Sequence, residues 1–582
     1  MPGLGISFGR GGATTFQQDL QNSDCIVIQG SNMAECHPVG FRWVMAARER
    51  GATIIHVDPR FSRTSAVASL HVPIRAGTDI ALLGGLIRHV IENGRFFREY
   101  VVNYTNAPTL VDERFEDTED LDGLFSGWDP EEKYDPATWQ YQGVEGTVPA
   151  AGHKELFAEK GAGRHDLRGV KMLEREQDPT LQHPRCVFQV VRRHFARYTP
   201  EMVEQVCGIP QATFAQIAEA LCSNSGRDRT SAFVYAVGWT QHTVGVQYIR
   251  AASILQLLLG NMGRPGGGIM ALRGHASIQG STDIPTLFEL LPGYLPMPHA
   301  VQDASLETYV RNNQSATMWW NEMPKYIVSL LKAWFGERAT RENDYGFEWL
   351  PSLSGNHSHM TTVADMADGK LEGYFVMGEN PAVGSMNGAL HRKGLRQLDW
   401  LVVRDFAILE TAEFWRNAPE IDRGEVRPED IRTEVFFMPA AAHTEKEGTF
   451  TNTQRLLQWH EKAIEPPGDA RSELWFAYHL GLRLKKLYAD STLERDRPIQ
   501  ALTWEYGEDE PDAQKVLREI NGYTVADGKP VPGYAKLADD GSTACGCWIY
   551  SGCAAEGVNQ PARRRPASEQ SWWRPSGDGR GR

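Results

Sequence analysis

The sequence predicts an α/β fold with two Rossmann-like units that are related by an internal duplication. The runs DCIVIQG and YFVMG are short, apolar and end at glycine, as buried parallel strands do. Each is followed by any residue and an asparagine, and then by a second apolar run with an aspartate at its end, TIIHVDP or WLVVRD. A threonine and a third apolar run with a proline, HVPI or VFFMP, complete both patterns. Five features in one order indicate a duplication.

Length and composition restrict the class of protein. The chain has 582 residues, 41% hydrophobic and 23% charged, which is typical of a globular protein with several domains. The net charge of −14 argues against a nucleic-acid partner. No run approaches the ~18 apolar residues of a membrane span, and MPGLGISFGRGGATT does not resemble a signal peptide.

We expect three regions along the chain. The first α/β domain covers residues 1–276 and carries an acidic, turn-rich surface insertion at about 103–184. The second α/β domain, which we expect to be incomplete, covers 277–485 and begins with an irregular stretch at 284–370. Residues 486–582 form a connecting segment, with a basic, low-complexity and disordered tail from about 561.

The stretch LLLGNMGRPGGGIMALRGHASIQGSTD lies between the two units. Its consecutive glycines, 266–268, predict a close backbone approach. They are followed by Arg273, whose planar guanidinium matches a carboxylate or a phosphate. A structural salt bridge is the alternative for an arginine, but the position between two nucleotide-type units favours a role in a shared reaction centre.

The carboxyl ends of the predicted strands are the expected ligand edge, because helix N-termini there offer free N–H groups to phosphate. Asp58 ends the second strand, where it could accept from a ribose hydroxyl or a base. G-x-G-x-x-G is absent, so an ordinary NAD site is not indicated. Thr78 or Asp79 is expected to cap the helix that follows the third strand, and His242 is either a ligand contact or a satisfied core histidine.

Two further segments carry polar or sulfur groups. In HTEKEGTFTNTQRLLQW we expect a polar hairpin with a tight turn at Glu447-Gly448. The motif STACGCWIYSGC places Cys545, Cys547 and Cys553 close together, but no fourth ligand is evident, so a metal site there is the less favoured alternative. The other five cysteines are expected to be small buried side chains.

The motifs GSNMAECHPVGFRW, DPRFSRTSAVA, GWTQHTVG, LLLGNMGRPGGGIMALRGHASIQG, MGENP and EKEGTFTNTQR resemble, in this order, the major subunits of respiratory formate dehydrogenases. These are molybdopterin oxidoreductases that carry molybdenum or tungsten on bis(molybdopterin guanine dinucleotide). The resemblance covers about residues 8–562 and implies that each unit holds the guanine nucleotide arm of one pterin. It also implies an Fe-S beta subunit and a membrane cytochrome b gamma subunit as partners, and a periplasmic, membrane-associated complex.

The resemblance also assigns residues. Arg273 would bind the carboxylate of formate beside the metal, with His275 next to it. The positions that would line the two pterin arms are Gly30, Asn32, Glu35, Asp58, Arg60, Gly238, Gln241, His242, Gly378, Asn380, Asp405, Thr411, Thr449, Asn452 and Arg455.

The chain departs from this family at both ends. Family members begin with a cysteine-rich [4Fe-4S] domain, followed by a selenocysteine or cysteine metal ligand and a histidine. SFGRGG is expected a few residues after that ligand, so the ligand would lie upstream of Met1. We therefore expect the chain alone to be an unstable, inactive fragment that also lacks the C-terminal domain. The alternatives are another molybdopterin oxidoreductase, such as a nitrate reductase, and a non-catalytic nucleotide- or cofactor-binding remnant; the R-G-H loop and GWTQH favour formate over nitrate.

Overall fold

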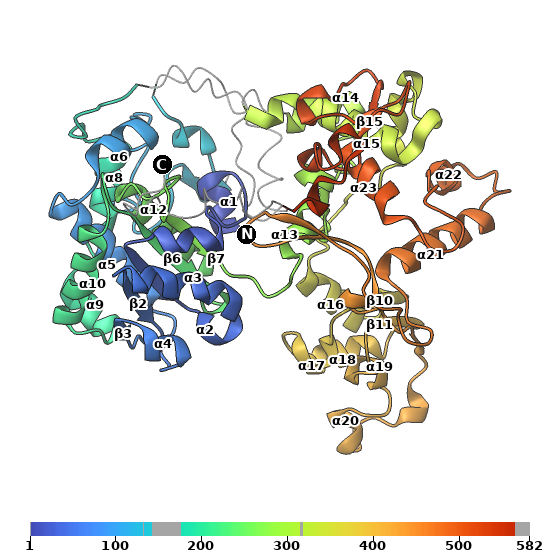
Figure 1. Cartoon of the computed structure of the whole chain (residues 1–582), viewed down its shortest axis with the longest axis horizontal. Helices are drawn as coiled ribbons and strands as arrows, with labels where there is room; N and C mark the ends of the chain where they lie inside the picture. The colour runs from blue at the N-terminus through green and yellow to red at the C-terminus, as the bar shows by residue number, and fades with distance from the viewer. Residues whose placement is uncertain (1, 132, 143–175, 315–317, 565–582) are drawn as a thin grey trace.

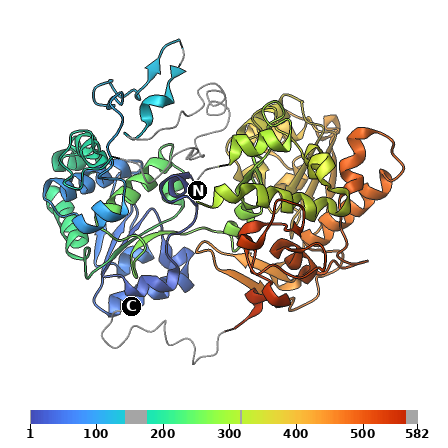
Figure 2. The same ribbon diagram turned by 90° about the horizontal axis from the view of Figure 1, so that it is seen from above.

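The computed structural model describes residues 2–131, 133–142, 176–314 and 318–564, which form two lobes (Figure 1). Part of the predicted insertion, residues 143–175, and the tail from 565 lie outside the described residues. The first lobe contains the first predicted unit, and the second lobe contains the second unit together with the C-terminal part of the chain. Figure 2 shows the same two lobes from above.

The first lobe is built on a parallel five-stranded sheet in the order β3-β2-β1-β6-β7. The strands are β1 (Cys25–Gln29), β2 (Thr53–Val57), β3 (Leu70–Val72), β6 (Ser231–Tyr235) and β7 (Gly268–Ala271). Side chains of β1 alternate between two separate cores, with Val27 in one and Ile26 in the other. Because both faces are buried, the strands are continuously apolar, as the sequence predicted.

Helices cover both faces of this sheet. One face packs on α3 (Pro38–Glu49), and the other packs on α5 (Asp79–Glu92) and α12 (Gly245–Leu258). The remaining described helices of this lobe are α1 (Pro2–Phe8), α2 (Met33–Cys36), α4 (Arg63–Val67), α6 (Arg98–Tyr104), α8 (Val187–Phe195), α9 (Pro200–Cys207), α10 (Gln211–Ser223) and α11 (Val237–Thr240). The insertion adds the short strands β4 (Trp128–Asp129) and β5 (Lys133–Tyr134).

Thr78 occupies the predicted N-cap position of α5, but it makes no side-chain capping bond: its hydroxyl donates to the carbonyl of Arg75 (2.7 Å) rather than accepting from the helix. The Asp79 carboxylate is buried and accepts from the side chains of Gln29 (2.7 Å) and Trp239 (3.0 Å). Asp79 therefore joins the end of β1 to α11.

The second lobe contains a parallel three-stranded sheet, β10 (Gly373–Met377), β11 (Trp400–Arg404) and β12 (Glu434–Phe437). One face packs on α16 (His359–Ala367) and α18 (Gly388–Leu395). On the opposite face Phe375 and Phe436 remain 42% and 40% exposed, although α21 (Glu473–Leu487) brings Phe476 within 6.3 Å of the Phe375 ring. The short helices α17 (Pro381–Gly384), α19 (Glu410–Glu413) and α20 (Pro419–Asp422) follow the strands.

The prediction of an irregular stretch at 284–370 is wrong in its central part. It contains β8 (Leu290–Leu291), β9 (Leu295–Pro296), α14 (Leu306–Asn313) and α15 (Met323–Phe335). Apolar residues run almost without interruption through α15, and most of its side chains are buried. Its Tyr326 ring stacks on Trp548 at 4.2 Å.

Residues after 485 do more than connect, because they complete this core. The cluster around α15 includes Ala501, Val531, Leu537 and Trp548. The elements of this part are α22 (Arg497–Ala501), α23 (Ala513–Asn521), β15 (Tyr523–Thr524) and β16 (Thr543–Ala544). The boundary at 485/486 remains a prediction, but packing crosses it.

The predicted polar hairpin is formed by β13 (Gly448–Thr451) and β14 (Leu457–His460). Its turn lies at 452–455 rather than at Glu447-Gly448, since Gly448 is the first residue of β13. The turn contacts the first lobe, where Ala13 N–H donates to the Thr453 carbonyl (3.3 Å) and Gln17 N–H donates to Gln454 Oε1 (2.6 Å). Figures 1 and 2 both show this hairpin reaching from the second lobe towards the N-terminus.

Glu519 on α23 makes stability depend on pH. Burial raises the pKa of its carboxyl from 4.5 to about 7, while the Tyr506 hydroxyl donates to it (2.6 Å). Between pH 4.5 and 7 the unfolded chain releases this proton first, so native stability falls as pH rises. Glu519→Gln removes this cost of ionisation, so it is expected to raise the free energy of unfolding by about 2–3 kcal/mol at pH 8 and to change it little at pH 4. Urea denaturation at the two pH values measures the difference. The exposed control Glu508→Gln should show no such difference, and equal effects at both pH values would contradict the assignment.

In the described residues no helix is both long enough and apolar enough to cross a membrane.

Candidate active site

The loop after β1 is closed by a short chain of hydrogen bonds. Gly30 adopts φ +67° at the strand end. The Asn32 Oδ1 atom accepts from the Thr64 hydroxyl (2.9 Å), whose oxygen accepts from Ala34 N–H (3.0 Å). The Asn32 amide also donates to the Glu35 carboxylate. The loop after β1 and the helix after β2 are thereby fixed to one another.

The same contacts recur after β10. Gly378 has φ +65°, Asn380 Oδ1 accepts from the Thr411 hydroxyl (2.7 Å), and that oxygen accepts from Ala382 N–H (3.1 Å). The Asn380 amide donates to Glu410 (2.7 Å). The two predicted ligand edges therefore have the same local construction, which the strand–Gly–x–Asn pattern and the later threonine had indicated.

In the first sheet the strand order reverses between β1 and β6, and the backbones touch there. Gly238 N–H donates to the Gly30 carbonyl (3.1 Å). A Cβ on Gly238 would lie 2.7 Å from Gly30 Cα, so only glycine permits this contact. Gln241 follows on the exposed surface, and His242 is half-buried with its ring 5.6 Å from that of Tyr248.

The aspartates at the ends of the second strands remain accessible. Asp58 Oδ1 accepts from Arg60 N–H (2.8 Å), and Asp405 Oδ1 accepts from Phe406 N–H (2.7 Å). Both residues are half-buried, and the Arg60 side chain is exposed. Each carboxylate can accept further hydrogen bonds from a ligand.

Arg273 follows β7 and is held by neutral acceptors. Its guanidinium donates to Gln279 Oε1 (2.8 Å) and to the Gly11 carbonyl. Burial lowers the pKa of Arg273, which nearby Tyr235 opposes. No ion pair joins Arg273 to a carboxylate among the residues that the structure describes, so the alternative of a structural salt bridge is wrong. The positive charge is half-buried and is not cancelled by a contacting anion.

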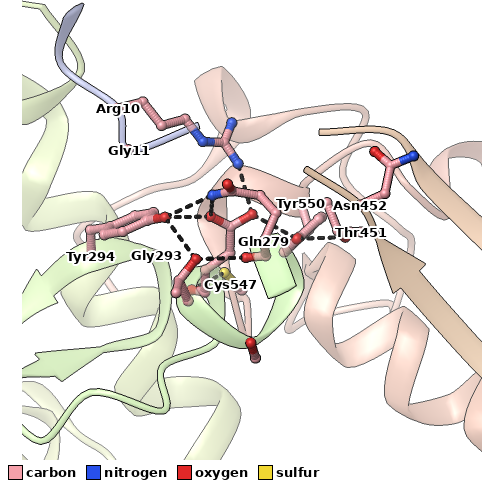
Figure 3. A network of polar contacts seen from close by, with 12 residues as sticks. Arg10, Gly11, Gln279, Gly293, Tyr294, Thr451, Asn452, Cys547 and Tyr550 are labelled. Carbon is pink, nitrogen blue, oxygen red and sulfur yellow. Dashed lines mark hydrogen bonds and ion pairs between the residues drawn. The ribbon is translucent and has the colours of Figure 1, made fainter. Parts of the chain in front are cut away.

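A buried carboxylate, that of Asp283, is separated from Arg273 by the side chain of Gln279, which forms a hydrogen bond to each of them. The Asp283 side chain is fully buried and accepts from Arg10 (2.7 Å), Gln279 Nε2 (2.8 Å), the Tyr294 hydroxyl (2.7 Å) and the Tyr550 hydroxyl (2.8 Å). Figure 3 shows these four side chains converging from different parts of the chain. Both Gln279 and Asp283 lie on α13 (Ile278–Asp283).

The hairpin supplies the other side of this region. The Tyr550 oxygen also lies 2.7 Å from Thr451 Oγ1 at the end of β13, and because the single Tyr550 proton is given to Asp283, the Thr451 hydroxyl is the donor in this contact. Arg455 adopts φ +66° in the turn, and its Cγ and Cδ lie 3.5 Å from a Cβ placed on Gly12. Burial and the neighbouring Arg10 lower the pKa of Arg455. Asn452 Oδ1 accepts from two backbone N–H groups of the turn (3.1 and 3.2 Å), which shapes the turn itself.

The predicted site residues therefore divide into groups. Arg273 and Arg455 share the region around residues 10–12, and the His37 ring, which follows the first ligand edge, contacts the Arg273 carbonyl (3.2 Å). His275 is exposed. Thr449 lies within β13, and the positions at the two strand edges belong to separate lobes.

The three late cysteines make structural contacts. Each thiol donates to a backbone carbonyl: Cys545 to Ile520 (3.4 Å), Cys547 to Asp283 (3.8 Å) and Cys553 to Leu517 (3.9 Å). Burial raises the pKa of Cys545 to about 11 and of Cys553 to about 12, so the thiols stay protonated. No cluster of three or more His, Cys, Asp or Glu suited to a metal occurs in the described part of the chain. Among the other five cysteines Cys36 is exposed, contrary to expectation.

Sequence reasoning missed Arg10, Gln279, Asp283, Tyr294 and Tyr550. Gln279 and Asp283 are spaced i, i+4, which puts them on one helix face, and this was the available signal. Arg10 and Tyr550 are distant in sequence from α13 and carried none.

Comparison with known proteins decides the family. The family described as molybdopterin oxidoreductase matches residues 9–414 and 436–481. The chain belongs to the molybdopterin oxidoreductases. This match confirms the resemblance seen in the sequence. Members of this family carry a molybdopterin cofactor with molybdenum or tungsten.

Several curated relatives of this oxidoreductase are formate dehydrogenase subunits. It is 41% identical to the nitrate-inducible formate dehydrogenase major subunit of Escherichia coli (strain K12), over 96% of this chain and 54% of that protein. It is 40% identical to the formate dehydrogenase-O major subunit of the same organism, over 96% and 54%, and to formate dehydrogenase 2 subunit alpha (cytochrome c-553) of Nitratidesulfovibrio vulgaris, over 97% and 54%. The chain spans about half the length of these relatives.

Two buried polar atoms at the first strand edge of this oxidoreductase are unpaired among the described residues. The Ser31 hydroxyl, beside Gly30, is buried and has no hydrogen-bond partner among the described residues. The Gln29 Oε1 atom at the end of β1 is likewise without a described partner. Because buried polar atoms in native proteins are normally paired, a donor and an acceptor left open at the carboxyl end of a parallel strand fit an additional polar ligand there.

Proposed function

We propose that this chain is the catalytic part of a formate dehydrogenase, which oxidises formate to CO2 at a molybdenum or tungsten bis(molybdopterin guanine dinucleotide) centre. The observation that carries the proposal is Arg273, a half-buried guanidinium with neutral partners and no contacting carboxylate among the described residues. Such a group binds a small carboxylate through a bidentate pair of charge-assisted hydrogen bonds. The names of the relatives support formate as that carboxylate.

The chain would divide its roles among its own residues. Arg273 binds and orients formate, and His275 follows it at the exposed end of the loop. When bound, the cofactor supplies the acceptor of the hydride, or of the proton and two electrons, that formate gives up. The two strand edges would each hold one guanine nucleotide arm, with Asn32 and Asn380 at matching places.

We further infer that the two edges arose by internal duplication, since the same glycine, asparagine and threonine contacts occur in both. The residues proposed to line the arms are Gly30, Asn32, Glu35, Asp58, Arg60, Gly238, Gln241, His242, Gly378, Asn380, Asp405, Thr411, Thr449, Asn452 and Arg455. The proposed partners are an Fe-S beta subunit and a membrane cytochrome b gamma subunit, and the proposed location of the membrane-associated complex is the periplasm. The proposed metal ligand is a selenocysteine or a cysteine.

Formate turnover by the purified holoenzyme tests the proposal. We expect formate-dependent reduction of a viologen dye, no nitrate reduction, and release of two GMP per chain after acid hydrolysis of the cofactor. Fully loaded enzyme that does not oxidise formate would contradict the assigned substrate. Bound guanine nucleotide without molybdenum or tungsten would instead favour a cofactor-binding remnant.

A further inference from the structure

Gln279 stands between the substrate arginine and a buried carboxylate. Its Oε1 atom accepts from Arg273 Nη1 (2.8 Å), and its Nε2 atom donates to Asp283 Oδ1 (2.8 Å). Gln279 and Asp283 are both fully buried and lie one turn apart on α13. Gln279 is therefore shared between a cation and an anion that do not contact each other.

The carboxylate fixes which way the amide points. An ionised carboxylate only accepts hydrogen bonds, and Asp283 is paired with Arg10 at 2.7 Å. Gln279 must therefore present its N–H to Asp283, which leaves its oxygen facing Arg273. If the amide were reversed, an N–H group would face the guanidinium and the hydrogen bond to Arg273 would be lost.

The amide also keeps the negative charge away from Arg273. A carboxylate in its place would form an ion pair with the guanidinium and compete with an anionic substrate, whereas an amide oxygen orients the guanidinium without neutralising it. Tyr294 and Tyr550 donate to the two oxygens of Asp283 (2.7 and 2.8 Å), so the carboxylate is fully engaged and cannot turn towards Arg273.

We propose that Gln279 is a positioning residue that holds Arg273 ready for a substrate carboxylate, and that Asp283 sets the orientation of Gln279. This inference rests on the proposed function of Arg273. The same contacts fasten residues 10 and 11 to the site, because Arg10 pairs with Asp283 and the Gly11 carbonyl accepts from Arg273. The position of Arg273 is thus coupled to the N-terminal segment.

Two nearly isosteric substitutions separate positioning from simple structural support. Gln279→Leu removes both hydrogen bonds and is expected to raise the KM for formate roughly tenfold, which corresponds to losing one hydrogen bond to a charged group. Gln279→Glu is expected to raise KM further at pH 8, because the new carboxylate ion-pairs with Arg273. As pH falls, the Glu variant alone should recover a low KM, since its protonated form donates to Asp283 and accepts from Arg273 as glutamine does.

The measurements are KM and kcat in the holoenzyme from pH 5 to 9, and binding of 13C-formate to the holoenzyme, without an electron acceptor, by NMR line broadening. Ser281→Ala, on the same helix, is the matched control and should leave both unchanged. Asp283→Asn should weaken formate binding as Gln279→Leu does. Thermal denaturation of every variant reports whether it is folded.

Each outcome has one meaning. If the wild-type protein neither binds nor oxidises formate, the proposed function fails. If wild type binds formate, Arg273→Ala abolishes binding, and both Gln279 variants stay within twofold of wild type, the positioning role is wrong while the proposed function stands. Equal, pH-independent losses of kcat and thermal stability in both Gln279 variants, with unchanged KM, would show a structural role only.

Discussion

Arg273→Ala is expected to lower kcat/KM for formate by roughly 10²–10⁴-fold, because two charge-assisted hydrogen bonds of about 1.5–3 kcal/mol each are lost. Arg273→Lys keeps the charge but not the planar fork, so it should recover only part of the loss. Initial rates with a viologen acceptor, together with formate binding to the holoenzyme without an electron acceptor, measure both effects. Because Arg273 pairs with neutral acceptors, its removal leaves no contacting carboxylate unpaired among the described residues. The free energy of unfolding should therefore change little.

The control for this prediction is Arg311→Ala, which removes an exposed guanidinium at the end of α14 in the other lobe. It should leave formate kinetics unchanged. If Arg273→Ala retained wild-type kcat/KM with correctly loaded cofactor, the carboxylate would have to bind elsewhere, and the proposed role of the loop after β7 would be wrong.

The parallel strands were predictable because their physics is local. A strand that is buried on both faces must be continuously apolar, and CIVIQ, TIIHV and SAFVY show this without any knowledge of their neighbours. The glycine and asparagine that follow β1 and β10 were also visible, since the positive φ and the hydrogen bond to a later threonine need those residue types. Local rules therefore predicted the two matching loops at the strand ends.

The chemistry around Asp283 was not predictable in this way. Arg10, Tyr294 and Tyr550 reach one carboxylate from segments that are up to 540 residues apart, as the pair Arg10 and Tyr550 shows. Nothing in the local sequence of any one of them indicates the others. In the same way the core around α15 was not predicted, because it is completed by residues far along the chain such as Val531 and Trp548. Sequence patterns failed where the determining contacts are long-range.

The ion pair between Arg392 and Glu420 is expected to have the largest effect on stability. Arg392 on α18 donates twice to the Glu420 carboxylate (2.9 and 2.8 Å), and the two side chains are only 14% and 8% exposed. Arg392 also donates to the Ala382 carbonyl (2.6 Å), so the pair supports the loop that positions Thr411. Removing one partner leaves the other charge buried, and Glu420→Ala should lower the free energy of unfolding by about 3–5 kcal/mol.

Replacing both partners tests whether the cost arises from an unpaired charge. The double variant Arg392→Met with Glu420→Leu should be more stable than either single variant, because both charges of the pair are removed and only Arg396, 3.7 Å from Glu420 in the wild type, remains. Arg392 lowers the pKa of Glu420 to about 2, so the wild-type stabilisation should be present above pH 4.5 and be lost as pH falls towards 2. Urea denaturation across this range measures it, and the double variant should lack this pH dependence. If the single variants had the same free energy of unfolding as wild type, solvent would already screen the pair. The loop at the end of β10 would then be held by Asn380 and Thr411 without help from this ion pair.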